Sequence, residues 1–179
     1  EITTDDLRRL GFISSNGNML FKNRIMFPIL NFRNNVIAFG GRVLDDFGPK
    51  YLNSSDSVLY KKNRNLYFTN DFITATKKKG YAFIVEGYFD VLSLNKLGFA
   101  NAASPSGTAL TYQQLESISK YTSKILICFD NDDAGLKATE RVLEIKNQIS
   151  KQVEIHCLNL PAEYKDISEV FESKPEIFD

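Results

Sequence analysis

The chain has 179 residues, 43% of them hydrophobic, which is enough for one α/β domain with a core and a smaller attached unit. No apolar run approaches the roughly 18 residues that a membrane span needs, and no signal peptide is recognisable, so we expect a cytoplasmic protein without a membrane segment. Basic and acidic side chains balance at 22 each, but they are unevenly distributed. Residues 1–80 carry 13 basic and 7 acidic side chains, and residues 81–179 carry 9 basic and 15 acidic ones. A basic half beside an acidic half indicates a polyanion-binding surface beside a metal-binding pocket, although lysines that only solvate the surface explain the charge equally well.

The basic half begins with a short helix expected at 3–10. Strand-like runs at 24–30 and 36–43 then predict an antiparallel hairpin, with Pro28 at a sheet edge or a bulge. The polar and aromatic stretch 44–70 suits nucleic acid, because Lys and Arg hold phosphates and aromatic rings stack on bases. A solvated loop with its aromatic rings turned to the core is the alternative interpretation.

The acidic half, after a helix expected at 71–79, has an alternating pattern. Strands are expected at 81–85, 101–103, 124–129 and 153–158, and helices at 87–97, 111–121 and 133–149. Alternation of this kind predicts right-handed crossovers in a parallel sheet. Asp166 and Glu169 form a possible helix cap near the end of the chain. Cys128 and Cys157 lie in apolar runs, so we expect core thiols rather than a disulfide.

Two of the expected strands end on carboxylates. Glu86 follows one strand, and Asp130 and Asp132 follow another. Ligands bind at the carboxyl ends of strands in open α/β sheets, so these side chains should share one rim, where a hard divalent cation would relieve their repulsion. Structural alternatives exist, because Asp132 or Asp133 can cap the following helix and Asp90 can support a helix dipole.

Several segments together resemble a known family. A strand ending in Glu-Gly-Tyr-x-Asp at 86–90, a Gly-Thr loop, and a strand ending in Asp-x-Asp-x-Ala-Gly at 130–135 resemble the Toprim domain of bacterial primases, topoisomerases and some nucleases. Segments 24–29, 36–42 and 49–54 are similar to stretches of the catalytic core of bacterial DnaG-type DNA primases, in the same order. The resemblance covers nearly the whole chain.

The resemblance implies an α/β fold in three parts. A basic α+β subdomain with an antiparallel hairpin would span 1–80, a Toprim domain with a parallel sheet flanked by helices 81–165, and the start of a truncated helical segment 166–179. The family's zinc domain and helicase-binding domain would lie outside this chain, which we therefore expect to be an excised, monomeric core. Zinc is expected only in a domain that is missing here.

The resemblance also implies an activity, the synthesis of short RNA primers for replication. The 3′ hydroxyl of one ribonucleotide would attack the α-phosphate of a ribonucleoside triphosphate on a single-stranded DNA template, and pyrophosphate would leave. Mg²⁺ or Mn²⁺ would stabilise the charge of this in-line displacement. The replicative helicase and the single-strand-binding protein are implied partners, through domains absent from this chain.

Roles follow for particular residues. Glu86, Asp130 and Asp132 would be the catalytic metal ligands, with Glu86 as an alternative proton acceptor. Asp90 and Asp166 would be outer ligands. The nucleic-acid or nucleotide contacts would be Arg42, Lys50, Tyr51, Asn53, Lys61 and Arg64. Gly107 and Thr108 would form a phosphate loop, although a loop that needs a small residue explains them equally well.

Two positions depart from the family's pattern. Ser168 stands where a second acid is usual, so the outer metal would be held more weakly or through Glu169 or Glu163. Leu30 stands where a basic residue is common, which removes one nucleic-acid contact. Two other functions are alternatives: a haloacid-dehalogenase-type phosphatase, whose motif expects Thr or Val in place of Ala134, and a catalytically silent Toprim scaffold that binds DNA.

Overall fold

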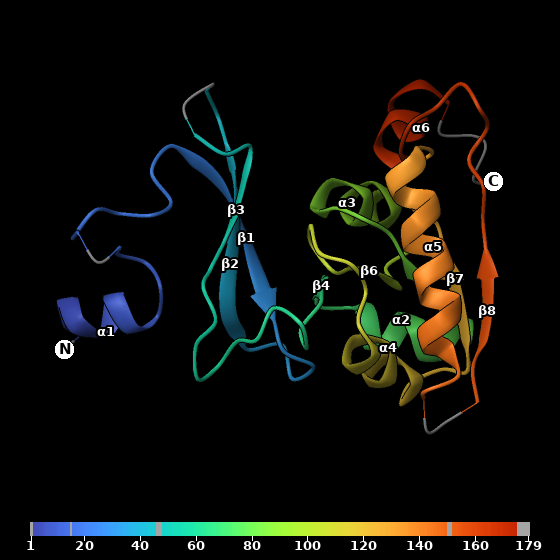
Figure 1. Cartoon of the computed structure of the whole chain (residues 1–179), viewed down its shortest axis with the longest axis horizontal. Helices are drawn as coiled ribbons and strands as arrows, with labels where there is room; N and C mark the ends of the chain where they lie inside the picture. The colour runs from blue at the N-terminus through green and yellow to red at the C-terminus, as the bar shows by residue number, and fades with distance from the viewer. Residues whose placement is uncertain (1, 15, 46–47, 150–151, 175–179) are drawn as a thin grey trace. The chain divides into compact units, whose positions relative to one another are not determined.

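The computed structural model describes residues 2–14, 16–45, 48–149 and 152–174. It divides into two compact units, Glu1–Asn65 and Leu66–Asp179 (Figure 1). No helix among the residues described is both long and apolar enough to cross a membrane.

The first unit is built on a three-stranded antiparallel sheet. Its elements are α1 (Thr4–Arg9), β1 (Arg24–Leu30), β2 (Val36–Val43) and β3 (Tyr51–Asn53), and the strand order is β1-β2-β3. The predicted hairpin is confirmed with its bounds, and Pro28 lies in the edge strand β1 as expected. At the hairpin turn, the side-chain oxygen of Asn31 accepts hydrogen bonds from the backbone N–H groups of Arg33 and Asn35, which fixes the reversal of the chain.

The second unit is built on a five-stranded sheet with the order β4-β6-β5-β7-β8. Its strands are β4 (Tyr67–Phe68), β5 (Ala82–Ile84), β6 (Ala102–Ser104), β7 (Lys124–Ile127) and β8 (Glu154–Cys157). Its helices are α2 (Phe72–Lys79), α3 (Tyr88–Lys96), α4 (Tyr112–Ser119), α5 (Asp133–Lys146) and α6 (Ile167–Ser173). All neighbouring strands are parallel except β4, which runs antiparallel to β6.

Helices cover both faces of this sheet. The chain crosses from β5 to β6 in one direction and then from β6 to β7 and on to β8 in the other. Right-handed crossovers therefore place α3 on one face and α4 and α5 on the opposite face. The contacts agree, because α6 packs against α3 while α4 packs against α5. The predicted parallel sheet flanked by helices is confirmed.

The core of the second unit is formed by the central strands and the helix faces on them. Ile84, Ile125 and Ile127 are completely or almost completely buried, as is Leu115 of α4. Cys128 is also buried, and burial raises the pKa of its thiol to about 12, which leaves it unreactive. The prediction of a core position for Cys157 is wrong: this residue is exposed, because β8 is an edge strand that has a neighbour only on one side.

The division into compact units falls earlier in the chain than the predicted domain boundary after Gly80. The segment between these two boundaries, residues 66–80, contains β4 and α2, and β4 joins the second sheet through the pairing of Tyr67 with Ser104. Neither β3 nor β4 was expected, because both lie in the polar and aromatic stretch 44–70, which shows no strand period. The domain limits at 80 and 165 remain a prediction.

Candidate active site

Glu86 lies directly beyond β5 and connects three strand ends. Its side-chain Oε1 accepts a hydrogen bond from the backbone N–H of Asp130 at 3.1 Å, which ties it to the end of β7. Its backbone carbonyl accepts a hydrogen bond from the hydroxyl of Ser104, the last residue of β6, at 2.5 Å. Burial, together with the negative charges of Asp132 and Asp90, raises the pKa of Glu86. The carboxyl ends of β5, β6 and β7 therefore meet at this residue.

Asp130 is the carboxyl group most strongly perturbed by the others. Burial first, and then the negative charges of Glu86, Asp90 and Asp166, raise its pKa from 3.8 to about 7. The protein thus holds more negative charge at this rim than the site can stabilise at neutral pH.

Asp132 caps helix α5, as one of the two interpretations of the sequence predicted. Its Oδ1 accepts hydrogen bonds from the backbone N–H groups of Ala134 and Gly135, both at 3.0 Å, and the bond from Gly135 is the main reason that the pKa of Asp132 is lowered. Only one carboxylate oxygen makes these bonds. Capping and metal ligation are therefore compatible, since Oδ2 points away from the cap and toward Lys165.

Gly135 is the residue that lets the carboxylate loop close. A Cβ atom at this position would lie 2.0 Å from the backbone oxygen of Asp130 and 2.9 Å from its carbonyl carbon. Backbone atoms cannot swing aside as a side chain can, so any side chain here would displace Asp130.

Asp90 is only 7% exposed and has partners for both of its oxygens. Oδ2 accepts a hydrogen bond from the backbone N–H of Gly87 at 2.9 Å, at the start of α3. Oδ1 accepts one from the Ser168 hydroxyl at 2.9 Å and a longer one from the Ser168 N–H at 3.3 Å. Burial raises the pKa of Asp90, and the hydroxyl of Ser168 opposes that rise. Asp90 therefore joins α3 to α6. The hydrogen-bond donor from α6 is Ser168, one of the two positions that depart from the pattern described above.

Asp166 and Glu169 form the cap that was predicted near the end of the chain. The Asp166 carboxylate accepts a hydrogen bond from the backbone N–H of Glu169 at 2.8 Å and so caps α6. The Glu169 carboxylate turns back to accept the N–H of Lys165 at 2.6 Å.

These carboxylates share one electrostatic environment, but as a complete set their side chains do not converge on one point. Among the residues described, no group of three or more His, Cys, Asp or Glu side chains is arranged to hold a metal ion. The chemistry of the donor set nevertheless fits a hard divalent cation, because all the donors are carboxylate oxygens, and burial together with their mutual repulsion raises the pKa of Asp130 and Glu86.

The loop that carries Gly107 and Thr108 follows β6, beside the Ser104 hydroxyl that binds Glu86. Gly107 has a φ of +80°, a conformation that favours glycine. The Thr108 hydroxyl donates to the carbonyl of Pro105 at 2.9 Å. This geometry accounts for the small residue, and the phosphate role of the loop remains a prediction.

The predicted nucleic-acid residues of the first unit fall into two groups. Arg42 pairs with Tyr51 across β2 and β3, and its guanidinium lies 5.8 Å from the centre of the Tyr51 ring. Asn53 lies two residues further along β3 and therefore shares this face. Lys50, immediately before β3, is exposed. Arg24, for which the sequence predicts no individual role, lies close by: its guanidinium donates to the carbonyl of Pro49, just before β3, at 2.8 Å.

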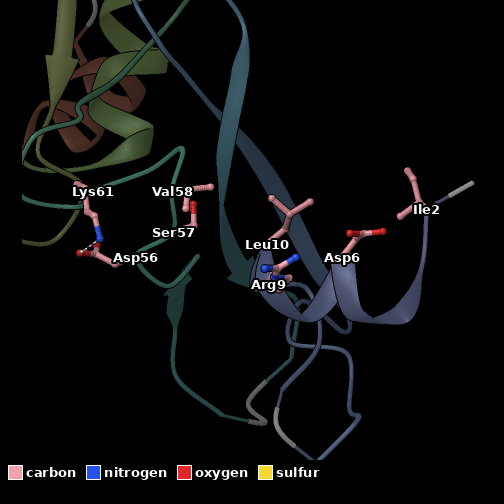
Figure 2. Close-up of a pocket in the computed structure, with 8 residues that line it drawn as sticks. All are labelled: Ile2, Asp6, Arg9, Leu10, Asp56, Ser57, Val58 and Lys61. Atoms are coloured by element: carbon pink, nitrogen blue, oxygen red, sulfur yellow. Dashed lines mark ion pairs between the residues drawn. The ribbon is translucent and has the colours of Figure 1, made fainter.

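Lys61 and Arg64 lie outside this sheet, in the segment that follows β3. The Lys61 ammonium pairs with Asp56 at 3.6 Å (Figure 2). It borders an open pocket of the first unit lined by Ile2, Asp6, Arg9, Leu10, Asp56, Ser57, Val58 and Lys61. Charges of both signs surround this pocket, so it lacks the uniform positive character expected of a phosphate-binding surface.

Two family descriptions match the chain. The N-terminal domain of the DNA primase catalytic core matches residues 1–72, and a Toprim-like domain matches residues 83–171. The DNA primase of Neisseria meningitidis serogroup A is 44% identical over 145 residues, which cover 80% of this chain and 25% of that protein. The chain belongs to the bacterial DnaG-type DNA primases. It spans about a quarter of the length of the curated DnaG-type relatives that it matches.

Solved DnaG-type structures agree with this assignment. The zinc-binding and RNA polymerase domains of the Aquifex aeolicus primase share 37% identity and a TM-score of 0.85, with 97% of this chain and 43% of that chain covered. A DnaG catalytic domain bound to single-stranded DNA shares 30% identity and a TM-score of 0.84, with coverages of 97% and 56%. Both departures from the DnaG pattern have a packing explanation, since Ser168 binds Asp90 and Leu30 is buried.

Proposed function

We propose that this chain is the central part of a primase that synthesises RNA primers on single-stranded DNA by metal-dependent nucleotidyl transfer. The observation that carries the proposal is the carboxylate rim at Glu86 and Asp130, where burial first and then neighbouring negative charge raise the pKa of Asp130 to about 7. A rim of this kind, in a chain that the primase families match along nearly its whole length, supports phosphoryl chemistry rather than a silent scaffold. The comparisons do not favour a phosphatase.

The carboxylates would act together as metal ligands. Glu86, Asp130 and Asp132 would hold Mg²⁺ or Mn²⁺, with Asp90 and Asp166 as outer members of the cluster. The bound metal would neutralise triphosphate charge and stabilise the in-line displacement. The Glu86 carboxylate is oriented by the N–H of Asp130, and Asp132 by the N-terminus of α5, so both side chains are already positioned by backbone groups. Gly107 and Thr108 would contact a phosphate.

The template would bind to the first unit. Arg42, Lys50, Tyr51 and Asn53 would contact the phosphates and bases of single-stranded DNA or the incoming ribonucleoside triphosphate, and Lys61 and Arg64 would extend that surface. The similarity to a catalytic domain solved with single-stranded DNA supports this assignment. The helicase and the single-strand-binding protein would bind through domains beyond this segment. We infer that the core acts as a monomer in the cytoplasm.

The test is template-dependent incorporation of labelled ribonucleotides on a long single-stranded DNA, with Mg²⁺ or Mn²⁺. The informative variant is Asp132→Asn, because Asn caps a helix as well as Asp does while removing the ligand charge. We expect incorporation to require template and metal and to fall at least about 100-fold in the variant, as for the removal of a group that stabilises transition-state charge.

Two results would contradict the proposal. Release of phosphate without polymer would indicate a phosphatase. If incorporation is absent, the binding of single-stranded DNA and of nucleotide is measured next, and the loss of both would exclude a primase core.

A further inference from the structure

A cationic side chain lies between two of the proposed metal ligands. The Lys165 ammonium is 3.7 Å from Oδ2 of Asp132 and 3.9 Å from Oδ2 of Asp130. Its positive charge opposes the rise in the pKa of Asp130 that burial and the neighbouring acids cause, and it adds to the lowering of the pKa of Asp132 by the hydrogen bond from Gly135. Neither aspartate is close to Lys165 in sequence, so the arrangement is a product of the fold.

The backbone fixes Lys165 in this place. Its carbonyl accepts a hydrogen bond from the N–H of Asn131, the residue between the two aspartates, at 2.7 Å. The Asn131 side-chain amide donates to the carbonyl of Tyr164 at 3.3 Å. On the other side, the Lys165 N–H donates to Glu169 at the start of α6. The loop that carries Lys165 is thus attached directly to the loop that carries the carboxylates.

The ammonium itself is held loosely. Both of its distances to the carboxylates exceed the 2.7–3.2 Å of a good hydrogen bond, and its side chain is 61% exposed. A lysine carries its charge on a flexible four-carbon stem, so the ammonium can leave while the backbone stays in place.

We propose that Lys165 is a built-in counter-cation, which neutralises the Asp130–Asp132 pair in the metal-free protein and is displaced when a divalent cation binds. This inference rests on the proposed function, since it concerns the metal that primer synthesis requires. Lys165 is a positioning residue in this scheme: it keeps both Oδ2 atoms turned toward one point. Displacement of the ammonium opposes metal binding, so Lys165 weakens the affinity for the metal.

The test is an equilibrium titration of the full 179-residue chain with Mn²⁺, in which the electron paramagnetic resonance signal of free Mn²⁺ reports binding. Lys165→Gln removes the charge and should tighten Mn²⁺ binding about twofold to fivefold, the range of an exposed ion pair. The gain should shrink as salt is added, because screening weakens the pair that the metal displaces. Lys165→Arg keeps the charge and should bind Mn²⁺ as the unmodified chain does.

Two further variants separate the possible causes. Lys124→Gln makes the same change in net charge at the start of β7, the end of the strand opposite the carboxylates, and should leave the affinity unchanged. Asp130→Asn should abolish saturable binding, which identifies the site being measured. Unchanged or weaker Mn²⁺ binding in Lys165→Gln, with Asp130→Asn still abolishing it, would overturn the role of Lys165 and leave the proposed metal site standing. Absence of saturable binding in every variant would overturn both.

Discussion

The two units place their candidate functional residues in different ways. In the first unit, Arg42 and Tyr51 face each other across neighbouring strands, and Lys50 and Arg64 are exposed on loops. In the second unit, the carboxylates of Glu86, Asp90, Asp132 and Asp166 each accept a hydrogen bond from a backbone N–H. A surface that binds phosphates tolerates small displacements, whereas metal ligands must be positioned within fractions of an ångström. The difference predicts that packing errors are more damaging in the second unit.

The largest contrast is expected between two glycines. Gly135→Ala forces a Cβ against the backbone of Asp130, at 2.0 Å from its oxygen, so we expect a loss of about 3 kcal/mol in the free energy of unfolding. Gly41→Ala in the first unit meets only the side chains of Phe21 at 2.9 Å and Arg24 at 3.0 Å, which can move, and should cost about 1 kcal/mol. Thermal unfolding of both variants measures the contrast, at roughly 2–4 °C per kcal/mol. An equal loss in the two variants would contradict the proposed difference between the units.

A smaller effect is expected at Ser168. Ser168→Ala removes the hydroxyl that donates to the buried carboxylate of Asp90, and a hydrogen bond to a charged group is worth about 2 kcal/mol. Urea unfolding at pH 7.5 measures the loss, which should decrease at lower pH as Asp90 becomes protonated. The control is Ser117→Ala, which removes a bond to a neutral backbone carbonyl within α4 and should cost about 0.5 kcal/mol. Equal losses would mean that the charge of Asp90 is not involved.

The smallest effect is expected at Asp130 and depends on pH. Because its pKa is raised to about 7, the folded protein binds this proton more tightly than the unfolded chain does. The free energy of unfolding therefore falls as pH rises from about 4 to about 7 and does not recover above that range. Asp130→Asn removes this penalty and should stabilise the metal-free protein at pH 8 by about 1 kcal/mol, a value reduced for partial exposure, and have little effect at pH 4.

Thermal unfolding in the presence of a chelator measures this dependence. Asp133→Asn, the same change at an exposed position in the first turn of α5, should bring no gain, because an acid there favours the helix dipole. A gain of the same size at pH 4 and pH 8 would show that the ionisation of Asp130 does not cause the effect.

Much of this site could be predicted from neighbouring residues in the sequence. The two strand ends at Glu86 and Asp130 are visible because an apolar run stops on acids, and the caps at Asp132 and Asp166 follow from the helix that begins next to each of them. Two expectations for Asp132, cap and ligand, could not be separated, because the sequence does not show that the cap uses one oxygen only. The prediction that Cys157 lies in the core was wrong because an apolar run does not show whether a strand lies at the centre or the edge of a sheet.

The sequence by itself determined the parallel sheet, the hairpin and the order of the acids along the chain, because strand periods, turns and caps depend on residues a few positions apart. Only the tertiary structure decided that Ser168 is the donor for Asp90, that Gly135 passes against the backbone of Asp130, and that Lys165 lies between two aspartates. The contacts of Ser168 and Lys165 depend on how separate loops come together at one end of the sheet, and that of Gly135 depends on the backbone path from β7 into α5. No local sequence pattern predicts which loops come together, because their positions are set by the packing of α3, α5 and α6 on the strands.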